Sequence, residues 1–262
     1  MSATSSSASP EIIIRHCNGL EELEACVQLQ KEVWGFDDID IVPSRVFLVA
    51  SKIGGQVIGA YQGDELVGYS LSIPGNRNGH VYLHSHMLAV KAPYRNLGLG
   101  RKLKLAQRED AMEKGIELIE WTFDPLEIKN AYLNIVKLGA VARRYNINQY
   151  GSFSSPLQGG LPTDRLVAEW WLLSERVQAV LANHDPTPFR LQETIAVPAE
   201  IYSWKQNSAD RPKAAELQNH NREKFLQAFR KGLVTLGYQR DERGNGAFLL
   251  GHWDETWSYA KH

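Results

Sequence analysis

A tight glycine turn offers the clearest chemistry in this sequence. An apolar run that ends at Val90 breaks at Pro93, passes through Arg95-x-x-Gly98-x-Gly100 and becomes a helical pattern bearing lysine and arginine. The first N–H groups of a helix have no partner within it and carry the positive end of its dipole. Because glycine leaves these groups bare, the turn is suited to bind phosphate oxygens.

Other phosphate-binding loops do not fit this stretch. The P-loop pattern Gly-x-x-x-x-Gly-Lys-Ser/Thr does not occur, and no Gly-x-Gly-x-x-Gly follows a strand near the N-terminus. Two glycines in this spacing also fit a simple turn. The Arg/Gln-x-x-Gly-x-Gly/Ala signature resembles that of the GNAT (GCN5-related N-acetyltransferase) superfamily, and the resemblance runs from about Ile12 to about Tyr150.

The resemblance implies a co-substrate, acetyl-CoA or another acyl-CoA, held by two stretches of chain. Loop amides would bind the diphosphate, and the strand before the loop would pair with the pantetheine arm in a gap between the fourth and fifth strands. The residues so assigned are Leu88, Val90, Arg95, Asn96, Leu97, Gly98, Leu99, Gly100, Arg101 and, on a later helix, Asn130. The Arg95 guanidinium adds a charge-assisted contact or is simply solvated. Lys102 and Lys104 are expected on an exposed helix face.

Polar residues in two central strands indicate a cavity. Alternation along a strand predicts that His84, His86, Leu88 and Val90 share one face and Leu83, Ser85, Met87 and Ala89 the other. In the next strand, Glu120 and Thr122 share a face. A central strand covered on both faces should be almost wholly apolar, because an unpaired buried charge costs several kcal/mol.

Acyl transfer to an amine needs a base for the ammonium proton and an acid for the leaving thiolate. Glu120 is the first candidate for the base, acting through a water molecule, and His86 is the second. Each of them also fits a hydrogen-bonded structural residue.

The acid departs from the family pattern. Many GNAT enzymes carry Asn-x-x-Ala-x-x-x-Tyr-x-x-x-Gly after the fifth strand, with the tyrosine near the coenzyme sulfur. Aligned on Ala131 and Gly139, this chain has Ile128 and Ile135 in place of the asparagine and the tyrosine. Tyr132, one turn earlier, either replaces the tyrosine in part or belongs to the core.

Two further residues are candidates for substrate contact. Asp124 either contacts the substrate or marks the start of the following helix. Arg143, with Arg144 beside it, is suited to hold the carboxylate of a larger acyl group.

Composition narrows the class of protein. The 262 residues are 43% apolar, as in soluble globular proteins, and 29 basic against 30 acidic residues disfavour a nucleic-acid partner. Cys17 and Cys26 are too few for a disulfide framework and wrongly spaced for zinc, so no metal is expected and a reducing compartment fits. The serine-rich residues 1–10 resemble neither a signal peptide nor an anchor, which predicts a disordered tail and a cytoplasmic, membrane-free protein.

The order of predicted elements matches the GNAT arrangement. Strands are expected at 12–14, 56–62, 66–73, 81–90, 116–123 and 140–150, and helices at 20–34, 99–114 and 126–138, with a turn at 74–79 and either a short helix or a loop at 37–45. A linker at 151–162 precedes a strand at 165–172 that completes the sheet. Beyond a connector at 183–188, a strand at 191–197, a helix at 213–231 and a hairpin of 234–240 with 247–252 are expected.

These elements predict an α/β (α+β) protein of GNAT fold. Its mixed central sheet would part between the fourth and fifth strands, with flanking helices and a C-terminal α/β extension. The tail would occupy residues 1–10, the acyl-CoA-binding domain 11–173, and the extension, packed on that domain, 174–262.

The leading interpretation is an acyl-CoA-dependent N-acyltransferase that acts on a small-molecule amine or amino acid by direct attack in a ternary complex. The acyl group is acetyl or succinyl, since some long GNAT proteins are succinyltransferases. One alternative is a non-catalytic acyl-CoA-binding regulatory module, favoured by the missing tyrosine. Another is a protein lysine acetyltransferase with an acidic groove formed by Asp37, Asp38 and Asp40. A homodimer remains open.

Overall fold

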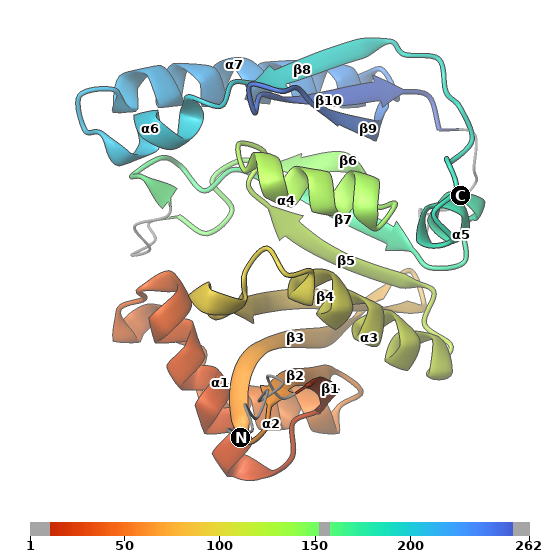
Figure 1. Cartoon of the computed structure of the whole chain (residues 1–262). Coiled ribbons are helices and arrows are strands. Elements are labelled where there is room, and N and C mark those ends of the chain that lie inside the picture. The colour runs from red at the N-terminus through yellow and green to blue at the C-terminus, as the bar shows by residue number, and fades with distance from the viewer. Residues whose placement is uncertain (1–10, 152–157, 254–262) are drawn as a thin grey trace, which may run out of the picture.

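The computed structural model describes residues 11–151 and 158–253 (Figure 1). The tail expected at 1–10 and part of the linker expected at 151–162 lie outside them. The N-terminal elements are β1 (Ile12–His16), α1 (Gly19–Trp34), η1 (Asp38–Asp40), α2 (Ser44–Lys52), β2 (Gln56–Gln62), β3 (Glu65–Arg77), β4 (His80–Val90), η2 (Ala92–Tyr94), α3 (Leu99–Glu113) and β5 (Leu118–Phe123). The C-terminal ones are α4 (Ile128–Tyr132), η3 (Leu133–Lys137), β6 (Val141–Asn146), β7 (Arg165–Trp171), α5 (Glu175–Leu181), β8 (Glu193–Val197), α6 (Ile201–Gln206), α7 (Arg211–Arg230), β9 (Val234–Arg240) and β10 (Gly246–Gly251).

All strands of the described residues join one sheet in the order β1-β2-β3-β4-β5-β7-β6-β9-β10-β8. Every neighbouring pair is antiparallel except β4 with β5. The strand expected at 165–172 is β7, which lies between β5 and β6. The mixed sheet with flanking helices confirms the predicted fold class.

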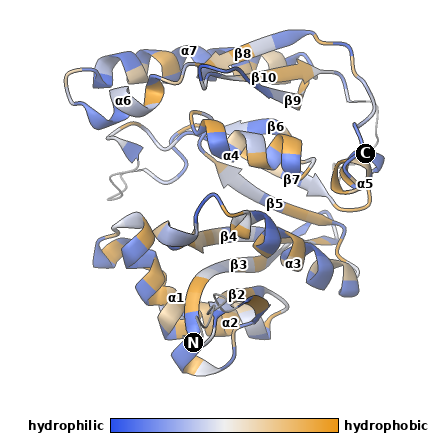
Figure 2. Ribbon diagram, viewed as in Figure 1, coloured by the Kyte–Doolittle hydropathy of each residue, from blue (hydrophilic) through white to orange (hydrophobic). Residues whose placement is uncertain are grey.

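Helices cover both faces of the N-terminal half of the sheet. Val57 and Ile58 are consecutive in β2 and so point to opposite faces. Val57 packs in a cluster with Phe47 of α2, whereas Ile58 packs in a cluster with Leu103 of α3. Hydrophilic and hydrophobic segments alternate along α1 and α3 in Figure 2, as expected of helices with one buried face.

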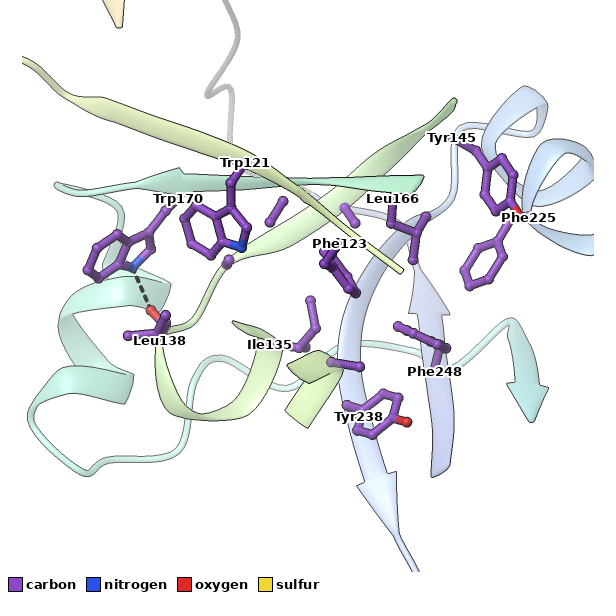
Figure 3. Close-up of a cluster of buried hydrophobic side chains, with 14 of the residues drawn as sticks. Trp121, Phe123, Ile135, Leu138, Tyr145, Leu166, Trp170, Phe225, Tyr238 and Phe248 are labelled. Carbon is purple, nitrogen blue, oxygen red and sulfur yellow. Dashed lines mark hydrogen bonds between the residues drawn. The ribbon is translucent and has the colours of Figure 1, made fainter. Parts of the chain in front are cut away.

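The largest core cluster joins the GNAT-like part to the C-terminal residues (Figure 3). Phe225 of α7 stacks on Tyr145 of β6 with ring centroids 5.6 Å apart, and lies 5.1 Å from Phe248 of β10. Trp170 of β7 donates its indole N–H to the Leu138 carbonyl at 2.6 Å. Full burial of one such aromatic side chain contributes about 2 kcal/mol. The C-terminal strands therefore share a core with the rest of the sheet.

The turn expected at 74–79 is wrong in its first part. β3 continues to Arg77, and Pro74 pairs with Leu83 of β4. On its other side β3 pairs with β2 only as far as Ser72. Because β2 does not extend past Ser72 to lie beside Pro74, no strand on that side needs the backbone N–H that proline lacks.

Other elements differ from expectation at their ends. The helix expected at 126–138 is a short α4 followed by the π-helical η3, in which Leu138 N donates to Leu133 O at 3.0 Å. The strand expected at 140–150 ends at Asn146. The segment 37–45, expected as either a short helix or a loop, holds η1 and the start of α2. The helices α5 and α6 were not predicted from the sequence.

Both cysteines are free thiols, with Sγ atoms of Cys17 and Cys26 3.9 Å apart. Among the residues that the structure describes, no helix has the length and apolar character needed to cross a membrane.

Candidate functional site

Strands β4 and β5 begin side by side and then part. Their parallel pairing is limited to Leu83 with Ile119 and His84 with Glu120, although β4 continues well beyond. β5 remains paired with β7 along its whole length. The backbone edge of β4 that faces the opening therefore has no strand partner there, and an extended chain bearing amide groups can pair with it.

His86 is the extra residue of a β-bulge in β4. Its neighbours Ser85 and Met87 pair with Ser72 and Leu71, which are consecutive in β3. One residue of β4 is thus left without a partner residue in β3. Beyond the bulge, the side chains of β4 therefore point to the opposite face from the one that strict alternation predicts.

The bulge corrects the predicted alternation along β4. Leu88 and Val90 join the cluster beneath α3, whereas Met87 and Ala89 join the cluster beneath α1 and α2. Ser85 also faces α3, since its hydroxyl accepts from Lys104. Leu88 and Val90 therefore do not continue the face of His84, as strict alternation required.

The turn after β4 presents backbone N–H groups without helical partners. Asn96 and Gly98 have positive φ values of 62° and 77°. The hydrogen bond from Lys102 N to Gly98 O, 3.1 Å long, is the first of α3. The N–H groups of residues 99–101 therefore have no acceptor within the helix.

The two glycines of this turn have different reasons to be glycine. A Cβ on Gly98 would meet nothing within 4 Å, and the positive φ of 77° is what favours glycine there. A Cβ on Gly100 would meet only Leu88 Cδ2, at 3.6 Å. Nothing inside the protein requires glycine at Gly100, whereas a ligand lying against the start of α3 would. The residues present thus fit a bound diphosphate.

Arginine side chains tie this turn to neighbouring elements. Arg95 Nε donates to the Val90 carbonyl at 3.0 Å, so its side chain folds back over the end of β4. Arg101 Nε donates to the Lys137 carbonyl at 3.3 Å and connects α3 to the end of η3. Both guanidinium groups keep further N–H donors.

The parted strands lead into a cavity of about 490 Å³. Its lining is Trp34, Phe36, Asp40, Val42, His86, Met87, Leu88, Thr122, Phe123, Asp124, Glu127, Lys129, Asn130, Tyr150, Gln158 and Arg165. The rings of Trp34 and Phe36 are stacked, with centroids 5.3 Å apart. The cavity thus brings together four of the predicted site residues, which are His86, Leu88, Asp124 and Asn130.

His86 has the properties of a base in this cavity. The His86 side chain is exposed toward the cavity, yet the protein atoms that surround it partly desolvate the ring. This desolvation, followed by the charge of His84, lowers the pKa of His86 below 6.5. The two rings lie 6.2 Å apart between centroids. A lowered pKa leaves the His86 imidazole neutral at pH 7, so that it can accept a proton.

Glu120 lies beside the cavity rather than in its lining. Its carboxylate is 2.8 Å from Arg77, 3.8 Å from the His84 ring and in contact with Arg144. Burial would raise the pKa of Glu120, but His84 and the two guanidinium groups outweigh burial and lower the pKa to about 2. Such a carboxylate stays charged at neutral pH and is a weak proton acceptor.

Arg143 belongs to the same ion-pair network and does not line the cavity. Arg143 Nη2 is 2.8 Å from Glu169, a residue of 2% side-chain exposure that also pairs with Arg144. The Arg143 guanidinium lies 5.3 Å from the ring centroid of Trp253.

The residues at the positions of the family's asparagine and tyrosine are buried in the core. Ile128 is 2% exposed and Ile135 is 0% exposed. Tyr132 packs at the edge of the same cluster, with the Arg240 guanidinium of β9 4.1 Å from its ring centroid. None of the three lines the cavity.

Asp124 combines both predicted roles with a third. One carboxylate oxygen accepts from Leu126 N at 2.8 Å, as at the start of a turn, and the residue lines the cavity. The other oxygen is 2.7 Å from Lys205 of α6, which also lies 3.0 Å from Glu127. Burial would lower the pKa of Lys205, but the two carboxylates raise it. The C-terminal part thus anchors the loop that lines the cavity.

Lys104, expected on an exposed face of its helix, is 4% exposed. Its Nζ donates to Ser85 Oγ at 2.8 Å and lies 3.6 Å from the ring centroid of Trp121. Burial holds the pKa of this amine well below 10.5. The side chain sits beyond the last β4–β5 pair, where the strands begin to part.

Several cavity residues escaped sequence reasoning. Tyr150 and Arg165 fell at the ends of predicted strands. Lys205, which pairs with the cavity-lining Asp124 without lining the cavity itself, belongs to a helix that was not predicted. The closely spaced aromatic residues Trp34 and Phe36 were a usable local signal. Among the described residues, no cluster of three or more His, Cys, Asp or Glu side chains is suited to hold a metal ion.

Comparison with known proteins identifies part of the chain. Residues 22–131 match the sequence model of the acetyltransferase (GNAT) family. This stretch of the chain therefore corresponds to a GNAT acetyltransferase domain. None of the curated proteins compared with the chain matches it significantly.

Three solved structures with a similar fold are distant in sequence. The ribosomal-protein-S18-alanine N-acetyltransferase from Escherichia coli is 12% identical, with a TM-score of 0.48 over 61% of this chain and 92% of that one. An acetyltransferase of the GNAT family from Streptococcus pneumoniae is 18% identical, with a TM-score of 0.49 over 61% and 98%. An aminoglycoside acetyltransferase from an uncultured soil metagenomic sample is 20% identical, with a TM-score of 0.41 over 46% and 82%.

Proposed function

We propose that this protein transfers an acyl group from an acyl-CoA to the amine of a small molecule, by direct attack in a ternary complex. The observation that carries the proposal is the parting of β4 and β5 after His84 and Glu120. Leu88 connects this opening with both ends of the site, because it lines the 490 Å³ cavity and its Cδ2 lies 3.6 Å from where a Cβ on Gly100, at the start of α3, would be. One opening can therefore hold the coenzyme at one end and the amine at the other.

The coenzyme would supply the thioester, acetyl or succinyl, and the chain would supply its binding groups. The backbone of Leu88 and Val90 is suited to pair with the pantetheine arm. The amides of residues 97–101 are suited to the diphosphate, with Arg95 beside them and Asn130 across the opening. Residues 11–173 would form this acyl-CoA-binding domain, and 174–262 the extension that supports its acceptor side.

His86 is the base that we propose for the ammonium proton. It lines the cavity, and its lowered pKa keeps the imidazole neutral. Glu120, which the sequence favoured, is held ionised between guanidinium groups. Its carboxylate would fix Arg77 and Arg144 rather than exchange protons.

The cavity supports a small-molecule acceptor. A volume near 490 Å³ falls in the range of small-molecule sites, roughly 300–1,000 Å³. Stacked Trp34 and Phe36 offer an apolar wall, and the Asp40 and Asp124 carboxylates offer partners for an ammonium group.

The test is calorimetric titration with acetyl-CoA and succinyl-CoA, followed by measurement of free thiol in the presence of pooled amines and D- and L-amino acids. Binding with amine-dependent thiol release is expected. Binding without release across the panel would overturn the proposal in favour of a non-catalytic module. Release that occurs only with lysine-containing peptides would overturn the small-molecule acceptor.

A further inference from the structure

We infer that Tyr150 is the acid of this site and donates its phenolic proton to the leaving thiolate. The inference rests on the proposed function. It concerns the half of the reaction that His86 does not serve, because the His86 imidazole accepts the protons of the incoming amine.

The chemistry of the cavity lining singles out few donors. A thiol has an ordinary pKa of about 8.5, and a phenol of about 10, so proton transfer between them is nearly balanced. Amides and aliphatic hydroxyls such as those of Asn130 and Thr122 are far weaker acids, and a guanidinium such as Arg165 does not release its proton in proteins. Lys129 is the other cavity-lining donor of suitable strength. Both side chains are exposed, Tyr150 by 37%, and Tyr150 is favoured because Thr122 of β5 holds its hydroxyl.

The Tyr150 hydroxyl is directed at the parted strand. Its Oη lies 2.8 Å from Thr122 Oγ1, which belongs to β5 beyond the last pair with β4. The Arg165 guanidinium lies 5.5 Å from the ring centroid.

The backbone around Tyr150 is held more firmly than most loops. Tyr150 N donates to Thr163 Oγ1 at 2.9 Å, and Gln149 N donates to Thr163 O at 3.0 Å. Asn148, in a left-handed conformation with φ 45°, accepts from Thr163 N through its side chain at 3.1 Å.

A buried carboxylate secures this turn in the core. Asn148 N donates to Asp164, a residue of 0% exposure, at 3.0 Å. Asp164 also accepts from Tyr145 and from Arg222 of α7, each at 2.7 Å. A catalytic group needs such a second layer of contacts to keep a productive orientation.

The step balances within the site. His86 first takes the ammonium proton and releases it to solvent water. As the N–C bond forms, the nitrogen loses its second proton to the neutral His86, and the C–S electron pair moves to sulfur. The Tyr150 proton then joins that sulfur, so that free thiol leaves, and water returns a proton to the phenolate. No oxidant, metal or covalent enzyme adduct is required.

The experiment compares Tyr150→Phe with the wild-type protein on the most active amine of the panel. The expected result is a fall in kcat of about 10²-fold with an unchanged acetyl-CoA dissociation constant. The basic limb of the kcat–pH profile should disappear. In protein carrying 3,5-difluorotyrosine at this position, the limb should move to lower pH, because fluorination makes the phenol more acidic.

Matched variants separate this role from a structural one. Tyr82→Phe removes a phenolic hydroxyl of β4 outside the cavity and should leave the limb in place, as should Lys129→Met. A Tyr150→Phe protein with kcat within about two-fold of wild type, or with the limb intact, would overturn the inference. Loss of the limb in Lys129→Met would transfer the role to Lys129. If the wild-type protein releases no thiol, the proposed function itself fails.

Discussion

The two ends of the opening between β4 and β5 are built in different ways. At the α3 end the binding groups are consecutive backbone amides, and their only sequence requirement is a short run with glycine at Gly98 and Gly100. At the cavity end the groups are side chains from separate segments, such as Trp34, Thr122 and Tyr150. Backbone recognition is local in the sequence, whereas side-chain chemistry is assembled only by the fold.

The largest effect should come from breaking the backbone end. In a Gly98→Val and Gly100→Val double variant, a β-branched residue takes a φ of 77° and two methyl groups cover the amides. Calorimetry should show affinity for acetyl-CoA reduced by at least about 10²-fold, since several charge-assisted hydrogen bonds are lost. Gly63→Val, at φ 60° in the β2–β3 turn, controls for backbone strain alone. Retained affinity in the double variant would contradict the loop assignment.

At the cavity end, His86→Gln should lower kcat/KM by about 10²-fold while acetyl-CoA still binds. Because the pKa of His86 is lowered, the acid limb of the wild-type kcat/KM profile should lie below pH 6.5. That limb should vanish in the variant. The exposed His184→Gln serves as control, and an acid limb that persists in His86→Gln would assign the base elsewhere.

Breaking the ion pair between Lys205 and Asp124 should have a smaller effect, and it should affect the cavity end of the opening but not the α3 end. Lys205→Met leaves the Asp124 carboxylate unpaired at 10% side-chain exposure, which costs about 3 kcal/mol of unfolding free energy. The KM for the amine should rise, with the acetyl-CoA dissociation constant within about two-fold of wild type. Lys213→Met removes an exposed pair with Asp210 and should leave the unfolding free energy almost unchanged, because exposed ion pairs contribute little. If Lys205→Met weakened acetyl-CoA binding as much as amine binding, the two ends of the opening would not differ in their dependence on the C-terminal part.

The smallest effect should be on pH dependence. The pKa of Glu120 is about 2 when folded against an ordinary 4.5, so its stabilising contribution is present above pH 4.5 and is lost as pH falls toward 2. In Glu120→Gln the Tm should vary less across that window than in wild type. Acyl transfer at neutral pH should fall less than in His86→Gln. A collapse of kcat equal to that of His86→Gln would restore Glu120 as a catalytic residue.

The sequence predicted best what short-range patterns encode. The strand Gln56–Gln62 was predicted to the residue, because a run of residues that favour strands, bounded by a glycine turn, is a local property of the sequence. The bulge at His86 was not predictable, since it depends on the register that β3 imposes on β4. For the same reason the strand at Pro74 was missed, because a missing N–H matters only where a neighbouring strand would accept it.

In the candidate site too, groups that are close together in the sequence were predicted, and groups brought together only by the fold were not. The turn at Gly98 and Gly100 was recognisable from spacing, whereas the partners of Glu120 on β3 and β6 were not. Lys104 shows the limit most clearly, because a lysine in a helical pattern is normally solvated. Its burial follows from the gap beneath α3, where Trp121 and Ser85 receive it.

The link between Asp124 and Lys205 has a thermodynamic consequence. A ligand that orders the loop around Asp124 must also favour the docked position of α6, because binding free energy and the opening equilibrium of that helix are coupled. Amide hydrogen exchange in Ile201–Gln206 should therefore slow when the cavity is filled, although no residue of that helix lines it. The C-terminal helices would then report occupancy of the site at a distance.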